Sequence, residues 1–273
     1  MKKSLLLILV SITISILLII FQNTIKKVLT ETTLTFIYNY IPCILPFSLL
    51  ISLTLKFINF LDLYIFLKNR KMCFVFDLFI IILIMISGTP GNITILKQLS
   101  KDQIYTKEKV DSLLINYGTI SLPFIYSITN KNSLFLYLII SVNSISYLLT
   151  KNSLSNSYIS NQQKTYSIKQ SITNSFITIY FFLIICVLIS LPINLIFNSK
   201  FLIFILGFFE TTFPAISLVK LNHYYFTYFL LASSSFSLIY QLYQSYKLFP
   251  IYRYIKKRLI LASLITILMF ICS

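Results

Sequence analysis

The chain has 273 residues, of which 57% are hydrophobic and only 11% are charged, and its mean hydropathy is +0.86. So few polar side chains cannot cover the surface of a water-soluble globule, which excludes a soluble enzyme or binding module. The formal net charge of +16 comes mostly from Lys and Arg in short connections between apolar segments. Basic residues in such connections orient a membrane protein, so we expect no nucleic-acid partner.

Apolar segments long enough to cross a bilayer core follow one another along the chain. We expect membrane spans at residues 4–21, 32–55, 112–129, 134–150, 171–190, 224–243 and 259–272. A helix needs ~20 apolar residues to cross, so the predicted fold class is an all-α polytopic membrane protein with about 7 transmembrane helices. Its expected location is the cell membrane, as a multi-pass protein.

The first segment follows Lys2 and Lys3 and resembles a signal peptide at its start. Its apolar run is longer than that of an ordinary signal peptide, and no small-residue cleavage site follows it. We therefore interpret residues 1–31 as an N-terminal transmembrane helix.

The apolar stretch at residues 73–100 is interrupted by the motif SGTPGN, residues 87–92. If this stretch crossed the membrane once, the basic cluster from Lys97 to Lys109 would lie outside the cell, against the positive-inside rule. A re-entrant hairpin that turns at the motif keeps the cluster in the cytoplasm. We therefore expect the chain to reverse direction at membrane depth.

The apolar stretch at residues 201–219 presents the same problem, with a break at GFFETTFP between Gly207 and Pro214. A single crossing would place the basic cluster from Lys247 to Arg258 outside the cell. We therefore expect a second re-entrant or broken helix here, entered from the opposite side.

These interpretations give the two halves the same order of elements with opposite orientations, which suggests an inverted repeat. Residues 32–150 would form the first membrane repeat, residues 151–170 a polar cytoplasmic loop, and residues 171–273 the second membrane repeat. Inverted repeats with broken helices are typical of secondary transporters, which bind their substrate between the repeats.

Glu210 is the outstanding polar residue, because it lies in the middle of an apolar stretch beside Thr211 and Thr212. A carboxylate at membrane depth costs on the order of 2–3 kcal/mol and normally faces a cavity with a partner. Glu210 is therefore a candidate for proton coupling or for binding a substrate cation or hydroxyl. The alternative is that it only forms a hydrogen bond to a neighbouring helix.

The motif SGTPGN and two weaker signals complete the candidate substrate-binding set. Glycine and proline at residues 88–91 allow a half-helix to begin in mid-membrane, where its free N–H groups suit a polar or anionic ligand. The stretch NYGTISLPF at residues 116–124 is a weaker version of this signal. Either break could instead be a structural kink, and Gln241 could join two helices. The candidates beside Glu210, Thr211 and Thr212 are Ser87, Gly88, Thr89, Gly91, Asn92, Thr119, Ser121 and Gln241.

The remaining residues show no pattern that indicates catalysis or metal binding. The cysteines stand singly in apolar surroundings, and no nucleotide-binding loop, nucleophile elbow or zinc motif occurs. We expect no enzyme, no catalytic residue, no cofactor and no metal. Asp77 stands near a basic cluster, so we expect it to form an interfacial ion pair.

Four segments resemble, in this order, the YlbJ-type sporulation integral membrane proteins: IPCILPF, SGTPGNITILKQL, GFFETTFPAISL and YQLYQSYKLFPIYRYIKKRL. That family belongs with the nucleoside-recognition or gate-domain membrane proteins, which are similar to concentrative nucleoside transporters. The resemblance covers residues 38–262 and is strongest at residues 87–92, at Gly207 and Glu210, and at Gln241. It departs from the family at ASSSFSLIYQ, where Ile239 occupies a His-like position.

The resemblance implies two gate-like membrane repeats that pass a small polar or anionic metabolite during spore formation, with dipicolinate as the leading candidate. It also implies the membrane around the forespore as a location. The expected partners are a small-molecule solute, the lipid bilayer and a coupling ion, either a proton or Na⁺. The alternatives are a non-transporting membrane scaffold of the sporulation machinery and a nucleoside transporter-like protein. The coupling ion and the oligomeric state, including a homo-oligomer, stay open.

Overall fold

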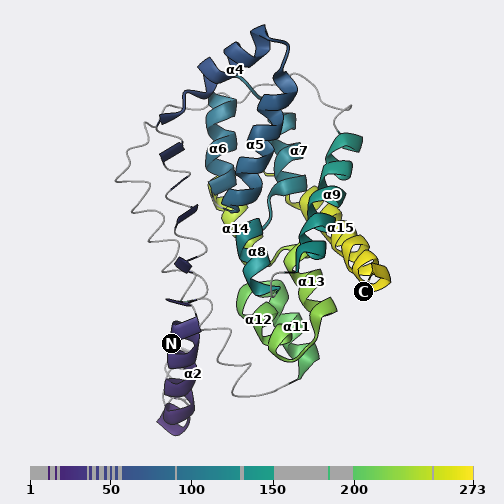
Figure 1. Ribbon diagram of the computed structural model, residues 1–273. Helices are drawn as coiled ribbons and strands as arrows, with labels where there is room; N and C mark the ends of the chain where they lie inside the picture. Colours follow the sequence, from purple (N-terminus) through teal and green to yellow (C-terminus); the bar gives the residue numbers. More distant parts are fainter. Residues whose placement is uncertain are drawn as a thin grey trace, which may run out of the picture.

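Every secondary-structure element that the computed structural model describes is a helix (Figure 1). The described residues are 12, 16, 19–35, 37–38, 41–42, 46–47, 50, 53–54, 57–89, 91–129, 132–150, 184, 199–247 and 249–272. The helices in chain order are α2 (Gln22–Thr35), α4 (Phe60–Asn69), α5 (Cys73–Ser87), α6 (Gly91–Lys101), α7 (Lys107–Tyr117), α8 (Leu122–Ile128), α9 (Ser133–Thr150), α11 (Lys200–Phe209), α12 (Thr212–Lys220), α13 (Tyr224–Ser233), α14 (Phe236–Ser245) and α15 (Ile251–Cys272). The predicted all-α class is confirmed for this part of the chain.

In the first half, α5 and α6 form a hairpin because they pack side by side and only residues 88–90 separate them. The next helix, α7, packs against α6 and ends at Tyr117. After a break at residues 118–121 the chain continues as α8, and α9 follows as one unbroken helix. The order of elements is therefore a hairpin, a broken helix and a long helix.

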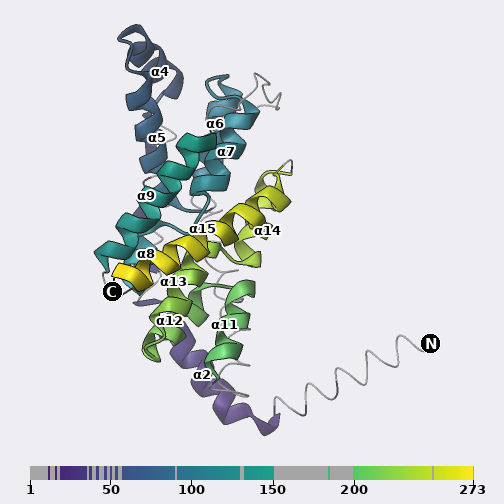
Figure 2. The same cartoon turned by 90° about the vertical axis from the view of Figure 1, so that its right-hand side faces the viewer.

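The second half has the same order. Helices α11 and α12 pack side by side, and only residues 210–211 separate them. Helix α13 ends at Ser233, and α14 begins after residues 234–235. The long helix α15 comes last. In both Figure 1 and Figure 2 the first hairpin lies in the upper part of the molecule and the second in the lower part, so the two hairpins approach the middle from opposite ends.

The two halves interlock through their broken helices. One core cluster joins α5, α6 and α7 to Leu238 and Leu242 of α14. A second cluster joins Phe124 and Ile125 of α8 to α9, α13 and α15. Half-helix α14 of the second half is therefore buried against α5, α6 and α7 of the first half, and half-helix α8 of the first half is buried against α13 and α15 of the second.

The spans predicted at residues 112–129 and 224–243, which precede α9 and α15, are each divided into two helices. The break within residues 112–129 agrees with the weaker signal at NYGTISLPF, because Pro123 fits the first turn of α8, where an N–H has no intrahelical partner. The unbroken span predicted at residues 224–243 is wrong. Serines bond readily to nearby backbone and so weaken a helix, and Ser234 takes a positive φ of 70° between α13 and α14.

Within the described residues, α9 is the one helix that is long and apolar enough to cross a membrane by itself, while α5 and α11 are apolar but shorter. Helix α9 matches the span predicted at residues 134–150, and α15 begins before the predicted start at residue 259. The spans predicted at residues 4–21, 32–55 and 171–190 and the loop at 151–170 lie wholly or partly outside the described residues. The count of about 7 spans stays a prediction.

Candidate functional site

The tip of the first hairpin lies directly against the break between α7 and α8. Gly88 ends α5 with a φ of 59°, a conformation that glycine adopts without strain. A Cβ atom on Gly88 would lie 2.5 Å from the backbone nitrogen of Ser121, so only glycine permits this approach. The hydroxyl of Thr89 donates to the carbonyl of Thr119 at 3.5 Å, and the Asn92 amide donates to the Thr89 hydroxyl at 3.4 Å.

The tip of the second hairpin is built around Glu210, whose side chain is only 1% exposed. Its carboxylate accepts hydrogen bonds from the backbone N–H groups of Thr212, at 2.7 Å, and Phe213, at 3.1 Å. These N–H groups begin α12 and have no intrahelical partner. A carboxylate at a helix N-terminus also interacts favourably with the helix dipole. Glu210 therefore caps α12 from within its own hairpin.

The second tip packs against the broken helix of its own half. Gly207 of α11 lies against Leu230 of α13, and a Cβ atom at this position would overlap the end of the leucine side chain. The rings of Phe209 and Phe236 lie 5.8 Å apart, which places the end of α11 beside the start of α14. Each hairpin tip is therefore next to a broken helix.

Tyr254 of α15 joins the two broken helices. Its buried hydroxyl donates to the carbonyl of Gly118 at 2.6 Å and lies 2.9 Å from the hydroxyl of Ser234. Gly118 belongs to the break between α7 and α8, and Ser234 to the break between α13 and α14. These breaks are far apart in the sequence, and the tyrosine brings them together.

Arg258 lies one turn further along α15 and is 0% exposed. Its guanidinium donates to the carbonyls of Asn116, at 3.0 Å, and Ala232, at 2.7 Å, and to the side-chain oxygen of Asn143, at 3.1 Å. Asn116 and Ala232 are in the last turns of α7 and α13, where carbonyls have no intrahelical partner. A helix C-terminus carries roughly half a negative charge, so the two ends together offset the buried cation.

Several buried polar atoms around these breaks have no hydrogen-bond partner among the described residues. Buried polar groups in folded proteins are normally paired, so each exception needs an explanation such as a water or a ligand. The atoms are Asn92 Oδ1, Asn116 Oδ1, Asn143 Nδ2, Thr211 Oγ1 and Arg258 Nε. They come from both halves of the molecule and from the long helices α9 and α15.

The structure brings together most of the predicted site residues but not all of them. Gly88, Thr89 and Asn92 meet Thr119 and Ser121 at the first tip. Two others lie at the same tip with local roles, since Ser87 bonds the carbonyl of Ile84 in its own helix and Gly91 begins α6.

The remaining predicted residues divide between the second tip and the body of α14. Glu210, Thr211 and Thr212 are consecutive residues of the second tip. Gln241 lies in the middle of α14, beyond its first turn, and is partly exposed. Within the described part of the chain, Gln241 makes no hydrogen bond to either tip.

Sequence reasoning missed the residues that join the two halves, above all Tyr254 and Arg258. In the sequence-based interpretation, the cluster from Lys247 to Arg258 only orients the chain, whereas the Arg258 side chain is buried within the packing of α15. A signal was present, since Tyr254 and Arg258 are four residues apart and continue the buried stripe of α15. The other buried residues of that stripe are Leu261, Ala262, Ile265 and Met269.

The ion pair predicted for Asp77 is confirmed. Its carboxylate lies 2.7 Å from the ammonium of Lys109 and accepts a hydrogen bond from the Tyr105 hydroxyl at 2.6 Å. The pair fastens α5 to the first turn of α7 at the outer end of the first hairpin. In the part of the chain that the structure describes, no group of three or more His, Cys, Asp or Glu side chains could hold a metal ion.

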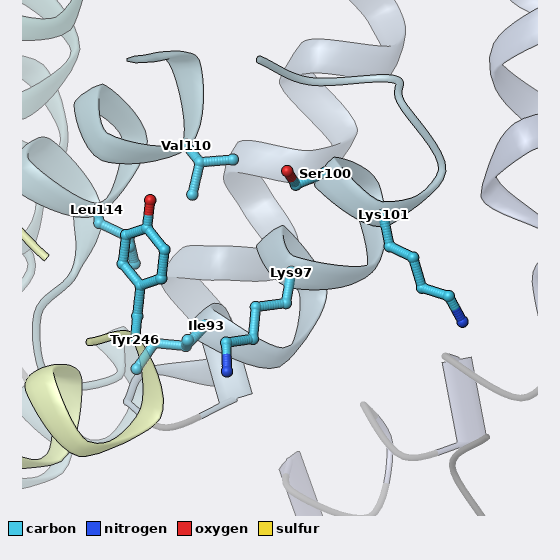
Figure 3. A pocket seen from close by; sticks show the side chains of 7 residues that line it. All are labelled: Ile93, Lys97, Ser100, Lys101, Val110, Leu114 and Tyr246. Atoms are coloured by element: carbon cyan, nitrogen blue, oxygen red, sulfur yellow. The ribbon is translucent and has the colours of Figure 1, made fainter. Parts of the chain in front are cut away.

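A small pocket lies away from the breaks, where α6, α7 and the end of α14 meet (Figure 3). Its volume of about 10 Å³ has room for one water molecule. Figure 3 shows the Tyr246 ring beside Leu114, and the ammonium group of Lys101 pointing away from that ring. The pocket is lined by Ile93, Lys97, Ser100, Lys101, Val110, Leu114 and Tyr246.

No family model, curated protein or solved structure shows a significant match to this chain.

Proposed function

We propose that this chain is an integral membrane permease for a small polar or anionic metabolite, with dipicolinate during spore formation as the leading candidate. The observation that carries the proposal is that Tyr254 joins two broken helices, each beside a hairpin tip, and that buried polar atoms near the breaks lack partners among the described residues. Secondary transporters bind their substrates at such broken helices between repeats of opposite orientation. A passing solute would supply the missing partners.

The distribution of apolar side chains supports a membrane location. Helices α5, α9 and α15 bury one face and expose large apolar side chains on another. Helices that are apolar all round suit a lipid environment, because the exposed face then meets hydrocarbon. Examples of exposed apolar residues are Phe74, Leu78, Ile82, Tyr137, Leu148, Leu149, Ile267 and Phe270.

The charge at the crossing of the broken helices favours a solute with an acidic or polar group. Two helix C-termini offset the charge of Arg258, but its Nε atom has no hydrogen-bond partner among the described residues and can donate to such a group. The start of α14 faces the same crossing, and its N-cap residue Ser235 makes no side-chain capping bond. A helix N-terminus without a side-chain cap and a guanidinium donor both favour an acidic or polar group.

In this proposal the residues of the second tip have different roles. Both carboxylate oxygens of Glu210 accept backbone hydrogen bonds, so Glu210 holds the tip in shape. Thr211 is 1% exposed, and its hydroxyl has no partner among the described residues. A hydroxyl buried without a partner costs roughly 1–3 kcal/mol. Contact with a solute would explain why this hydroxyl is present.

The second candidate function is a non-transporting scaffold of the sporulation machinery. The observation that favours it is the use of both Glu210 oxygens within one hairpin, because a purely structural residue would behave in the same way. In a scaffold, the hydroxyl of Thr211, which has no partner among the described residues, would have no function. The two functions therefore make opposite predictions for the loss of this hydroxyl.

The test compares dipicolinate accumulation in spores of a host that lacks its own such protein, rescued with the wild-type chain or with Thr211→Val. Valine keeps the shape of threonine and removes only the hydroxyl, so we expect the variant to reach the membrane in wild-type amount. We expect accumulation per molecule of protein to fall by ~10-fold, the equivalent of one lost hydrogen bond to a polar solute.

The matched control is Thr227→Val, because Thr227 is also fully buried but its hydroxyl donates to the carbonyl of His223 at 3.3 Å. This variant should lower the amount of folded protein and leave accumulation per molecule unchanged. Wild-type accumulation by Thr211→Val would count against a solute contact at the second tip. Repair of spore assembly by the wild type without any accumulation would support the scaffold.

A further inference from the structure

Three buried oxygen atoms lie at the outer end of the first hairpin, well away from the helix breaks. They are Ser100 Oγ on α6, Asp111 Oδ1 on α7, and the hydroxyl of Tyr246 at the end of α14. Ser100 is 2% exposed and Tyr246 is 4% exposed. None of the three atoms makes a hydrogen bond of ordinary length and angle among the described residues, although the Tyr246 hydroxyl lies close enough to the Asp111 carboxyl to lower its pKa.

Two of these residues line one enclosed space. Ser100 and Tyr246 both contribute to the pocket between α6, α7 and α14, which has room for one water molecule (Figure 3). Asp111 belongs to the same turn of α7 as the pocket residue Val110, and its carboxylate interacts with the Tyr246 hydroxyl. The site joins α6 and α7 of the first half to α14 of the second half.

Charged and titratable groups from each neighbouring helix surround Asp111. Burial raises the pKa of the Asp111 carboxyl to about 6, although the Tyr246 hydroxyl, Lys107 and Arg253 lower it. Glu108 on the same turn raises it further. On α6, Lys97 and Lys101 line the adjoining pocket. Asp111 precedes the apolar stretch of α7–α8, so it would lie at the membrane surface, where aqueous protons can reach it.

The size and charge of the pocket exclude larger or more highly charged ligands. A volume of about 10 Å³ is too small for a phosphate or carboxylate group. Lys97 lines the space and disfavours a metal cation, while the Lys101 ammonium points away from the Tyr246 ring. A water molecule, by contrast, fits in the space, which the Ser100 and Tyr246 side chains line, and the Asp111 carboxyl on the adjoining turn of α7 can bind a proton.

We propose that Asp111 and Tyr246 form a proton-binding site at the contact between the two halves of the protein, beside the water-sized pocket that Ser100 and Tyr246 line. With the proton bound, the neutral Asp111 lies beside the Tyr246 hydroxyl and the halves pack closely. Without the proton, a partly buried carboxylate faces Glu108, and this contact is weakened. The site is independent of the solute proposed above.

The sign of the pH dependence follows from the raised pKa. An unfolded Asp titrates near ~3.9, below the folded value of about 6. The site therefore stabilises the protein most when it is protonated, and this contribution falls as the pH rises from about 4 to about 6. Above about pH 6, Asp111 is unprotonated, and the contact between the two halves contains its carboxylate.

The test is infrared difference spectroscopy of the full chain in lipid, titrated from about pH 4 to about pH 8. We expect a protonated-carboxyl band that disappears with a midpoint near 6 and is missing in Asp111→Asn. In Tyr246→Phe the midpoint should move to higher pH, because the hydroxyl that lowers the pKa has been removed. Asp62→Asn on the exposed face of α4 is the matched control and should leave the titration unchanged.

Three outcomes would overturn the proposal: a midpoint near the ordinary Asp value of ~3.9, a band that persists in Asp111→Asn, or a midpoint that Tyr246→Phe leaves in place. Asparagine resembles the protonated carboxyl in shape and charge, so Asp111→Asn should fold. No transported solute enters the measurement, and its result is therefore separate from that of the permease test.

Discussion

The two hairpins reach the middle of the molecule with tips of different chemistry. At the first tip, Gly88 takes a φ of 59° and the chain lies directly on the backbone of Ser121. At the second tip, Glu210 supplies a carboxylate to the free N–H groups at the start of α12. The N–H groups at the start of a helix have no intrahelical partner, so a buried helix start needs an acceptor for them.

Both tips end one helix and begin the next, but they do so in two ways, and these respond differently to substitution. The first tip depends on the absence of a side chain, so any added atom meets backbone that cannot move aside. The second tip depends on the presence of one side chain, so a substitution is costly according to how well the new group accepts hydrogen bonds. Three substitutions distinguish the two tips, and all can be compared by thermal unfolding in the same detergent or lipid.

We expect the largest effect from Gly88→Ala. The new Cβ atom would lie 2.5 Å from Ser121 N, and alanine would also be held at a positive φ. Strain and overpacking together should lower the free energy of unfolding by about 3 kcal/mol or more. Unfolding at the wild-type temperature would mean that the first tip does not lie against Ser121.

Glu210→Ala should have an intermediate effect of about 2 kcal/mol, because it leaves the N–H groups of Thr212 and Phe213 without an acceptor. Glu210→Gln is the matched variant, since its amide oxygen can still accept one of the two bonds. It should recover about half of the loss. Equal losses for alanine and glutamine would show that the negative charge, rather than the capping bond, holds the second tip.

The smallest effect should come from Gly207→Ala. Here the added Cβ atom would meet the end of the Leu230 side chain, which can change rotamer, and the backbone of Gly207 is helical. We expect a loss of about 1 kcal/mol, at the low end of overpacking effects. Leu230→Ala combined with Gly207→Ala should cost less than the sum of the two single changes. Additive losses would argue against this contact.

The position of both tips could be predicted from the sequence because helix breakers are scarce in it. The chain has only 4 Gly and 7 Pro, so two of the glycines on either side of a proline in SGTPGN are a strong local signal. The second tip was predicted from charge as well, since a single crossing would misplace the cluster from Lys247 to Arg258. Local backbone chemistry and charge balance are both visible in a linear sequence.

The break at Ser234 and the position of Gln241 could not be predicted in this way. Serines are common in apolar helices, and only packing against α15 and the neighbouring break shows that the chain turns at Ser234. Gln241 was placed in the site because it is polar within a span. How far Gln241 lies from the tips depends on where α14 begins, and α14 begins directly after the break at residues 234–235.

The sequence by itself determined that the chain is helical, where its two hairpins turn, and that Glu210 is a buried acid of the second one. Only the tertiary structure decided that Glu210 caps its own helix and that Arg258 faces inward. A carboxylate binds whichever donors lie nearest, and a buried guanidinium needs acceptors, which here are mainly the free carbonyls at the ends of other helices. Those ends belong to α7 and α13, which meet at Arg258 only after the two halves have packed together.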